Sequence, residues 1–367
     1  MKVIQGLEAL QPPRPSCVLT IGNFDGVHRA HQKILACARD LAAPAGSPVV
    51  VLTFEPHPLT VVAPERVPPR LSALDDKLRL LAGAGADIAV IARSEPALLK
   101  LEAEAFIEEV IHARFHPAHI VEGPTFGFGR GRKGTPQLLA RLADRYGWQV
   151  HIVEPVRLSI DDGPALLVSS SLIRQLLSEG NVAAAAVGLG RPYCLTGEVI
   201  TGDRRGRTIG FPTANIAPAD QLVPGDGVYA GQAEVRAASH ACAISIGQKP
   251  TFSGQSRHIE AHLLDFDGDI YGQTIRLEFD RRLRDQRAFE SADALVRQLT
   301  LDVEDVRSRG QSEPRPPALY AQRQGQGSGP SEPRPRGSGP SELQPAPLDA
   351  KRQEQGSGAI SGQPAVS

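Results

Sequence analysis

Apolar runs separated by amphipathic segments dominate the chain from residue 16 to about residue 181. A buried strand is predicted for CVLTIGNF, and a helix for HQKILACARDLA, in which Leu35, Ala38 and Leu41 have the spacing of one helical face. The alternation continues through PVVVLTF, LDDKLRLLAGAG, ADIAVIA, AEAFIEEVIHARF, HIVEG, TPQLLARLADRYG and WQVHIVEPV. Repeated strand-helix units predict an α/β domain with a mostly parallel sheet, whose ligands bind beyond the carboxyl ends of the strands.

The pattern changes after Gly190 to short runs of alternating apolar and polar residues. These runs are CLTGEVITG, GVYAGQAEV, ACAISIG, RHIEAHLLDF and TIRLEFD, and clusters of Gly, Asp and Pro separate them. Such a pattern predicts a small antiparallel β domain, most simply a barrel, and a last helix is predicted over residues 291–309. We therefore expect one domain at residues 1–186 and a second at 187–309.

The segment 310–367 has neither pattern. Gly, Pro, Ser and Gln make up well over half of it, and Tyr320 is its only aromatic residue. Such a composition buries too little apolar surface to offset the entropy of ordering the backbone, which predicts a disordered tail. A proline-rich ligand for a partner domain is the alternative interpretation.

Charge and cysteine content narrow the class of protein. Forty basic and forty-one acidic residues give a formal net charge of -1, so there is no overall positive field to hold nucleic acid or an anionic membrane. No window has the eighteen or so apolar residues of a membrane span. The four cysteines are far apart in sequence, which favours reduced thiols over a disulfide framework. We expect a cytoplasmic protein that binds small molecules rather than nucleic acid or membrane, as a monomer or weak homo-oligomer.

The first candidate site follows the first predicted strand. In TIGNFDGVHRAHQ, the loop 22–26 leads into a helix whose first turn carries His28 and His31. The two imidazoles have a spacing seen in zinc sites, but no third ligand of the usual kind stands nearby. A glycine-bounded loop at a helix N-terminus is typical of anion sites, because free N–H groups point at the ligand. Phosphate binding and an ordinary polar helix start both remain open at this point.

A second helix start strengthens the phosphate interpretation. In VSSSLIR, Ser169, Ser170 and Ser171 precede Arg174 by one turn, so hydroxyls, N–H groups and a guanidinium gather at one N-terminus. An N-cap alone would explain one hydroxyl, but neither the triplet nor the arginine. The segment VEGPTFGFGRGRKGT adds a Gly-rich basic loop after a strand, with Arg132 near its end.

The second candidate site lies in the β region. Gly202, Gly206 and Gly210 in TGDRRGRTIGFPTANI permit a backbone loop to approach phosphates closely. Thr213 and Asn215 supply hard oxygen ligands, which suit Mg²⁺ rather than zinc. On composition alone, the segment is also compatible with an ordinary hairpin turn.

A carboxylate occurs on one of the predicted strands of this region. In RHIEAHLLDF, Glu260 shares one strand face with His258 and His262, while Ile259 and Leu263 take the other face. A kinase that acts on a primary alcohol benefits from a carboxylate that accepts the hydroxyl proton. The commoner fate of such a glutamate is to be a solvated strand residue.

Several of these motifs, in this order, resemble one known family. GNFDGVHRAH is similar to the GxFDGxHxGH motif of nucleotidyltransferases, VSSSLIR to ISSTxIR, and GPTFGFGRGRKG to the flavin-side loop of FAD synthetases. PTAN and ExHLLDF resemble riboflavin kinase motifs. Residues 1–309 thus resemble the bacterial bifunctional riboflavin kinase/FMN adenylyltransferases. The resemblance implies a Rossmann-like nucleotidyltransferase domain followed by a riboflavin-kinase-like β-barrel.

The resemblance also implies the substrates and the residues that contact them. ATP, riboflavin and FMN are the implied substrates, with Mg²⁺ as cofactor. The implied catalytic residues are His28, His31, Arg174 and, as general base, Glu260. The implied ATP contacts are Gly22, Asn23, Phe24, Asp25, Gly26, Ser169, Ser170, Ser171, Gly202, Gly206, Arg207, Gly210 and Pro212. The implied flavin contacts are Thr125, Phe126, Phe128 and Arg132, and the implied metal ligands are Thr213 and Asn215.

Three positions depart from the family pattern. Ala30 replaces the glycine between the two histidines, Thr125 replaces an Asn or Asp before the phenylalanine of the flavin loop, and Gln286 stands where Glu is more usual. The first two raise the alternative of a riboflavin kinase whose adenylyltransferase domain is impaired. A noncatalytic flavin- or nucleotide-binding protein is a third hypothesis, but a pure binder has no need of a base.

Overall fold

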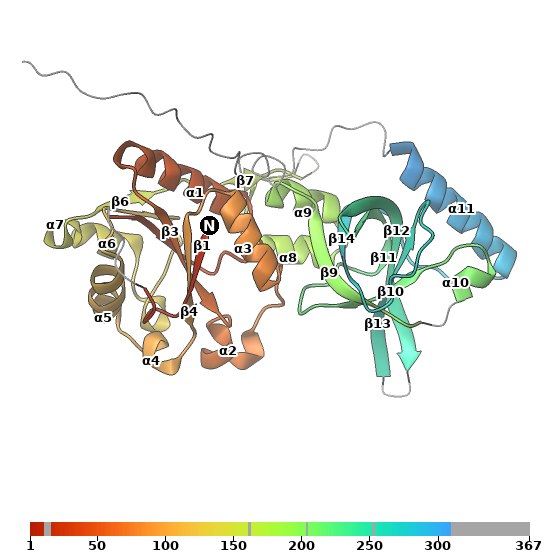
Figure 1. Cartoon of the computed structure of the whole chain (residues 1–367), viewed down its shortest axis with the longest axis horizontal. Helices are drawn as coiled ribbons and strands as arrows, with labels where there is room; N and C mark the ends of the chain where they lie inside the picture. Colours follow the sequence, from red (N-terminus) through yellow and green to blue (C-terminus); the bar gives the residue numbers. More distant parts are fainter. Residues whose placement is uncertain (11–15, 161–162, 203–204, 252–253, 310–367) are drawn as a thin grey trace, which may run out of the picture. The chain divides into compact units, whose positions relative to one another are not determined.

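The computed structural model describes residues 1–10, 16–160, 163–202, 205–251 and 254–309. The predicted tail at 310–367 lies outside these residues. The N-terminal part contains a six-stranded sheet in the order β1-β4-β3-β2-β5-β6, with every pair of strands parallel (Figure 1). Its strands are β1 Lys2–Gln5, β2 Val18–Ile21, β3 Val49–Glu55, β4 Ile88–Arg93, β5 His119–Glu122 and β6 Gln149–Ile152.

Helices connect these strands. They are α1 Arg29–Ala42, α2 Leu59–Val62, α3 Leu74–Gly83, α4 Pro96–Leu99, α5 Ala103–Phe106, α6 Pro136–Arg141 and α7 Ala143–Tyr146. Shorter turns are η1 Ala43–Ala45, η2 Pro64–Arg66 and η4 Arg130–Arg132, and a π-helix, η3 Ile107–Phe115, continues α5. A two-stranded ribbon, β7 Arg157–Leu158 with β8 Leu166–Leu167, precedes α8 Ser170–Ser178 and α9 Val182–Leu189.

Successive residues of the central strands contribute to two different apolar cores. On β3, Val50 and Leu52 belong to the cluster that includes Phe106, whereas Val49 and Val51 belong to the one that includes Leu35. Side chains alternate across a strand, so the sheet is buried on both faces, as parallel sheets usually are. The predicted α/β class is therefore confirmed. The sheet's edge strand β1 was absent from the predicted elements, because four residues before a proline-rich segment carry little pattern.

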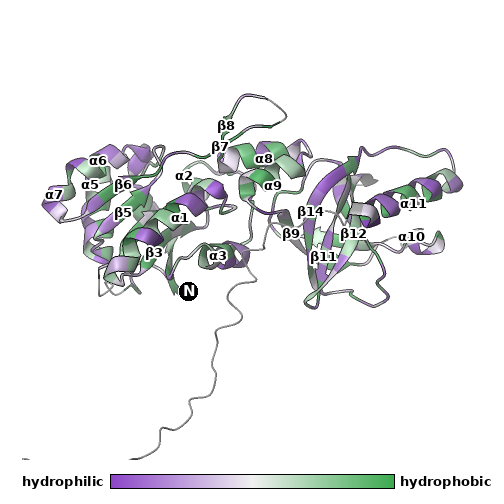
Figure 2. Ribbon diagram, turned by 90° about the horizontal axis from the view of Figure 1, so that it is seen from above, coloured by the Kyte–Doolittle hydropathy of each residue, from purple (hydrophilic) through white to green (hydrophobic). Residues whose placement is uncertain are grey.

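The second part is a closed antiparallel barrel in the order β10-β13-β12-β11-β14-β9. Its elements are β9 Tyr193–Ile200, α10 Arg205–Thr208, β10 Ala214–Pro218, β11 Gly227–Val235, β12 Ala238–Thr251, β13 Gly254–Leu263, β14 Thr274–Arg284 and α11 Ala292–Arg309. The barrel prediction is confirmed, with β10 as the strand that the sequence pattern missed. Val306 of α11 packs on Ala230 and Ala243 at the outside of the barrel, and both green and purple segments alternate along α11 (Figure 2).

The four cysteines are free thiols, and Cys17 and Cys242 are buried. The prediction that they form no disulfide is confirmed.

Candidate active sites

The loop between β2 and α1 has an unusual backbone. Phe24 and Val27 have positive φ angles of 49° and 38°, and Gly26 has φ 78°. Left-handed backbone is costly for residues other than glycine, so the surrounding structure must hold it in place. Phe24 and Val27 are only 2% and 1% exposed, so both anchor the loop in the core. The loop ends at His28, the N-cap residue of α1.

His28 and His31 lie face to face at the start of α1. Their ring centroids are 3.7 Å apart with an interplanar angle of 17°, and the ring of Phe24 lies 4.9 Å from that of His31. The Nδ1 atoms of both histidines are buried and have no hydrogen-bond partner among the described residues. Buried polar atoms are normally paired, so two unpaired Nδ1 atoms side by side are an uncommon feature of this helix start.

Burial controls the charge of both rings. It lowers the pKa of His28 to about 4, with a smaller contribution from the positive charges of Arg191 and Arg174. Burial, and then the neighbouring His28, place the pKa of His31 well below its usual value. Both imidazoles are therefore neutral at neutral pH, and each has one N–H to donate.

This arrangement makes stability depend on pH. Below the ordinary histidine pKa of 6.5, the unfolded chain takes up a proton at His28 that the folded protein does not take up until about pH 4. Stability is thus complete above pH 6.5 and falls on acidification. We expect His28 alone to lower the free energy of unfolding by about 2 kcal/mol between pH 7 and pH 5. Urea denaturation at the two pH values would measure this, and a His28→Gln variant with the same pH dependence as wild type would contradict it.

Asp25 connects the loop to a neighbouring segment. Its carboxylate accepts hydrogen bonds from the backbone N–H of Leu71 at 3.0 Å and of Ser72 at 3.2 Å. Arg174 donates to the same carboxylate at 2.5 Å, and through Nε to the carbonyl of Pro69 at 2.7 Å. Asp25 and Arg174 therefore form a partly buried ion pair that fixes the loop.

We expect Asp25→Asn to lower the free energy of unfolding by about 3 kcal/mol, because it leaves Arg174 without its charge partner and the two N–H groups with a weaker acceptor. FAD formation should fall with it, since the loop is displaced. Urea denaturation and product chromatography would measure the two effects. The matched control is Asp40→Asn on the exposed side of α1, which should change stability by less than about 0.5 kcal/mol.

The three serines at the start of α8 differ in their contacts. Ser169 is the N-cap, and its side chain accepts from the backbone N–H of Leu172 at 3.2 Å. Ser170 donates to the backbone carbonyl of Asp25 at 2.9 Å, and Ser171 is exposed. The structure thus brings the two predicted helix starts together at the carboxyl end of the sheet.

Two further residues at this site were not found by sequence reasoning. Arg191 donates to the carbonyls of Gly26 at 2.7 Å and Leu189 at 3.2 Å, which ties the loop to the end of α9. His57 lies 3.0 Å from the side-chain amide of Asn23. Both are distant from the loop in sequence, so no local pattern could have identified them.

The Gly-rich loop after β5 carries two stacked phenylalanine rings. The rings of Phe126 and Phe128 are 5.5 Å apart at 24°, and Phe128 is 5% exposed and packs on Phe106. Arg132 donates to the carbonyl of Thr125 at 3.0 Å, and both residues are exposed. The loop therefore has Thr125 and Arg132 on its exposed side, next to the half-buried ring of Phe126, which is stacked on Phe128.

The second site is on the outer face of the barrel. Ile259 and Ala261 of β13 are buried in the interior, whereas Glu260 between them faces outward, as the alternation predicted. Strand register places Glu260 directly opposite Asn215 of β10 and Ser245 of β12. The predicted base and one predicted metal ligand are thus neighbours.

The glycines of this site lie against its polar groups. A Cβ on Gly202 would stand 2.1 Å from the side chain of Asn215, and one on Gly206 would stand 2.2 Å from the carbonyl of Phe211 and 3.4 Å from the Thr213 hydroxyl. At Gly206 the backbone carbonyl leaves no room for a side chain, whereas at Gly202 a side chain would require Asn215 to move. Gly210 has φ 86°, a left-handed backbone conformation that favours glycine.

Pro212 and Arg207 belong to the segment that precedes β10. The carbonyl of Pro212 accepts a hydrogen bond from Nδ1 of His262 at 2.7 Å. Arg207 of α10 is exposed. The loop that precedes β10 is therefore attached to β13 on the same side as Glu260.

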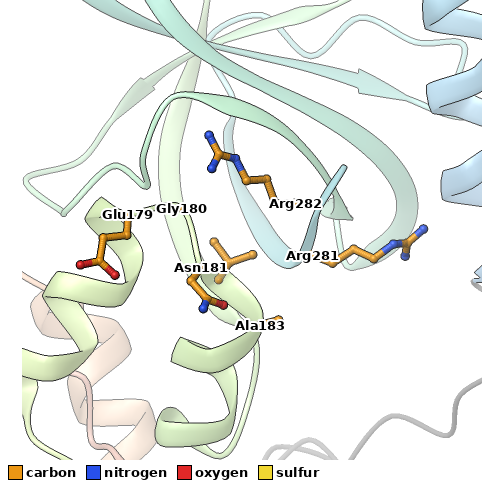
Figure 3. A pocket seen from close by; sticks show the side chains of 7 residues that line it. Glu179, Gly180, Asn181, Ala183, Arg281 and Arg282 are labelled. Atoms are coloured by element: carbon orange, nitrogen blue, oxygen red, sulfur yellow. The ribbon is translucent and has the colours of Figure 1, made fainter. Parts of the chain in front are cut away.

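A cavity of about 350 Å³ lies elsewhere, beside the turn between α8 and α9 (Figure 3). Arg281 and Arg282 line it from β14, together with Glu179, Gly180, Asn181, Val182 and Ala183. Arg281 is paired with Asp305 and Arg282 with Asp285, so their charges are already compensated. None of the residues predicted from the sequence lines this cavity.

Comparisons with known proteins match each of the two parts of the chain to a family. The FAD synthetase family matches residues 10–165, and the riboflavin kinase family matches residues 189–309. A bifunctional riboflavin kinase/FMN adenylyltransferase from Escherichia coli (strain K12) is 36% identical over 304 residues, which are 82% of this chain and 96% of that protein. The corresponding protein of Bacillus subtilis (strain 168) is 35% identical over 294 residues, 79% of this chain and 91% of that one.

A solved structure is also similar to this chain over most of its length. It is described as a macrolide-efflux protein from Streptococcus pneumoniae, and it matches with a TM-score of 0.74 and 32% identity over 84% of this chain and 99% of that one. Among the described residues, no helix has the length and apolar character needed to cross a membrane. Since both enzyme families match and the curated relatives are similar along nearly their whole length, the chain belongs to the family of bifunctional riboflavin kinase/FMN adenylyltransferases, which make FMN from riboflavin and FAD from FMN.

Proposed function

We propose that each reaction takes place in its own domain, with FMN made at the barrel site around Glu260 and FAD made at the site around His28 and His31. The observation that carries this proposal is that each family-matched range contains its own polar site built on glycine-rich backbone. The proposed division between the domains is at residues 186 and 187. Riboflavin, FMN and ATP are the small-molecule partners, in a cytoplasmic monomer or weak homo-oligomer.

In the barrel, Glu260 would act as general base. The primary hydroxyl oxygen of riboflavin attacks the γ-phosphorus of ATP, its proton passes to the Glu260 carboxylate, and ADP leaves. The glycines at 202, 206 and 210 would permit close contact of the loop with the ATP phosphates, with Pro212 fixing its exit and Arg207 near its outer side.

Thr213 and Asn215 are suited to hold Mg²⁺ in this site. Their hydroxyl and amide oxygens are hard ligands, and both side chains are half-buried against glycine backbone. No group of three or more His, Cys, Asp or Glu residues that could hold a metal occurs in the described part of the chain, so substrate phosphates would complete the ligand set. Bound Mg²⁺ neutralises phosphate charge during transfer.

In the α/β domain, a phosphate oxygen of FMN attacks the α-phosphorus of ATP and pyrophosphate leaves. An anionic phosphate needs no general base, so the residues serve to position the substrates and stabilise charge. The neutral His28 and His31 would donate N–H groups to phosphate oxygens, and the loop 22–26 with the serines at 169–171 would surround the nucleotide. Arg174 would act mainly through the Asp25 ion pair.

The flavin would bind at the loop after β5. Phe126 offers a ring for stacking, and Thr125 and Arg132 offer polar contacts beside it. Phe128 would act by supporting Phe126 from below, because it is buried.

One assay tests whether the protein carries out both reactions. Purified protein is incubated with riboflavin, ATP and Mg²⁺, and FMN and FAD are separated by chromatography. Accumulation of FAD through FMN is expected, and supplied FMN should be converted without riboflavin. FMN as the only product would instead support the impaired-adenylyltransferase alternative, which nothing in the comparisons favours.

Ala30 provides a separate test of that alternative. The residue is half-buried in the first turn of α1, where glycine would increase backbone freedom. We expect Ala30→Gly to leave the rate of FAD formation within about twofold and to cost up to about 1 kcal/mol of stability. Steady-state assays and thermal melting would measure both. A large gain in FAD formation would mean that the alanine methyl does impair the site.

A further inference from the structure

Gln286, just after β14, reaches across the barrel's outer face to two other strands. Its side-chain amide nitrogen donates to Ser245 Oγ at 2.8 Å and to the carbonyl of Ile246 at 3.1 Å, and lies 3.5 Å from the carbonyl of Gly227. Carbonyl oxygens only accept, so the nitrogen of the amide must be the atom that faces them. A carboxylate in the same place would have no proton to donate.

The backbone leaves room for this amide. A Cβ on Gly247 would stand 3.4 Å from the Gln286 amide nitrogen and 3.3 Å from the ring of His258. The contact with His258 would be tight and the contact with Gln286 close to ordinary van der Waals distance, so the Gln286 amide lies directly beside Gly247 of β12. The amide is thus held by the strand it contacts.

Ser245 connects Gln286 to the proposed base. In the β12–β13 register, Ser245 is the direct partner of Glu260. Ser245 is half-buried between the interior residues Ile244 and Ile246, so it faces outward like Glu260. Directly opposed residues of antiparallel strands have Cβ atoms about 4.5–5.5 Å apart, within reach of a serine hydroxyl and a carboxylate.

A serine hydroxyl can accept one hydrogen bond while it donates another, so Ser245 can link Gln286 to Glu260. Ser245 Oγ accepts a hydrogen bond from the Gln286 amide, which leaves its own O–H available to donate. We propose that Gln286 and Ser245 are positioning residues for the kinase reaction: Gln286 fixes the Ser245 hydroxyl, and this hydroxyl holds the Glu260 carboxylate where the riboflavin hydroxyl proton arrives. The proposal rests on the role of Glu260 proposed above.

The test compares kcat and KM of FMN formation in Ser245→Ala and Gln286→Leu. We expect kcat about tenfold lower in each, with KM for riboflavin and ATP within about twofold, because the base is misplaced but the substrates still bind. Ser245→Thr keeps a hydroxyl and should restore kcat to within about twofold of wild type. The double variant should also be only about tenfold slower, because both residues act through one hydroxyl.

The matched control is Ser239→Ala. Ser239 is on the same strand and donates to a glutamine, Gln232, at 3.1 Å, but its register partner is Glu234 of β11 rather than Glu260. This control should keep wild-type kcat and KM. FAD formation from FMN should be unchanged in all of these variants.

Several results would overturn the proposal. Wild-type kcat in both Ser245→Ala and Gln286→Leu would do so, as would an equal loss in Ser245→Thr or a loss confined to KM. If Glu260→Gln abolishes FMN formation while Ser245→Ala does not slow it, the inference fails and the proposed function stands. If Glu260→Gln keeps the wild-type rate, the proposed base is wrong and the inference fails with it.

Discussion

Replacing Glu260 with glutamine should reduce FMN formation by about 10²- to 10⁴-fold while conversion of supplied FMN to FAD continues. The amide keeps the size and much of the hydrogen bonding of the side chain, but it cannot accept the hydroxyl proton of riboflavin. Its register partners Asn215 and Ser245 are neutral, so neither offers a substitute base. Separate assays with riboflavin and with FMN as substrate would measure the two rates in one preparation.

Glu198→Gln is the matched control for this prediction. Glu198 also faces outward on a barrel strand, but it is exposed and on β9. Its substitution should leave both rates unchanged. A Glu260→Gln enzyme that still makes FMN at the wild-type rate would show that the proton leaves by another route.

The fold was predictable in class because its pattern is strong. Seven-residue β3 and fourteen-residue α1 carry clear strand and helix periodicities, and the change of period after Gly190 marked the beginning of the barrel. The strands that were missed are short: β1 and β10 have four and five residues, and β7 and β8 have two each. β10 also begins inside the PTAN segment, and Gly210 and Pro212 just before it indicate a turn rather than a strand.

The sites were predictable as lists of residues, but not as geometries. The sequence indicated His28, His31 and the serine triplet as polar helix starts, yet it could not show that the two rings stack or that burial keeps them neutral. These properties depend on packing between distant segments. Asp25 is the clearest example, because its partners Leu71 and Arg174 are 46 and 149 residues away in the chain.

The Gln286 position illustrates the same limit in the barrel. In the sequence it is only a departure from a family pattern. In the structure, its amide contacts a serine that is the register partner of the proposed base. Strand register, which a sequence pattern does not fix by itself, is what connects the two residues.

His31→Ala should produce the opposite separation to Glu260→Gln, with FAD formation from FMN lowered by about 10²- to 10³-fold and FMN formation retained. The neutral ring of His31 lies at a helix N-terminus and is stacked on His28, so its removal deletes one N–H donor and frees the other ring to move. Charge on the phosphates of the transition state would then be poorly stabilised, although the substrates can still bind.

Because His31 also packs on Phe24, a loss of activity needs a control for folding. FMN formation in the same preparation supplies one, since that reaction is assigned to the barrel. His151→Ala supplies another: His151 is on β6 of the same sheet and pairs with His119 at 3.1 Å, outside the loop. This variant should keep both activities. If both reactions fell together in His31→Ala while His151→Ala stayed active, the two chemistries would not be separable by domain.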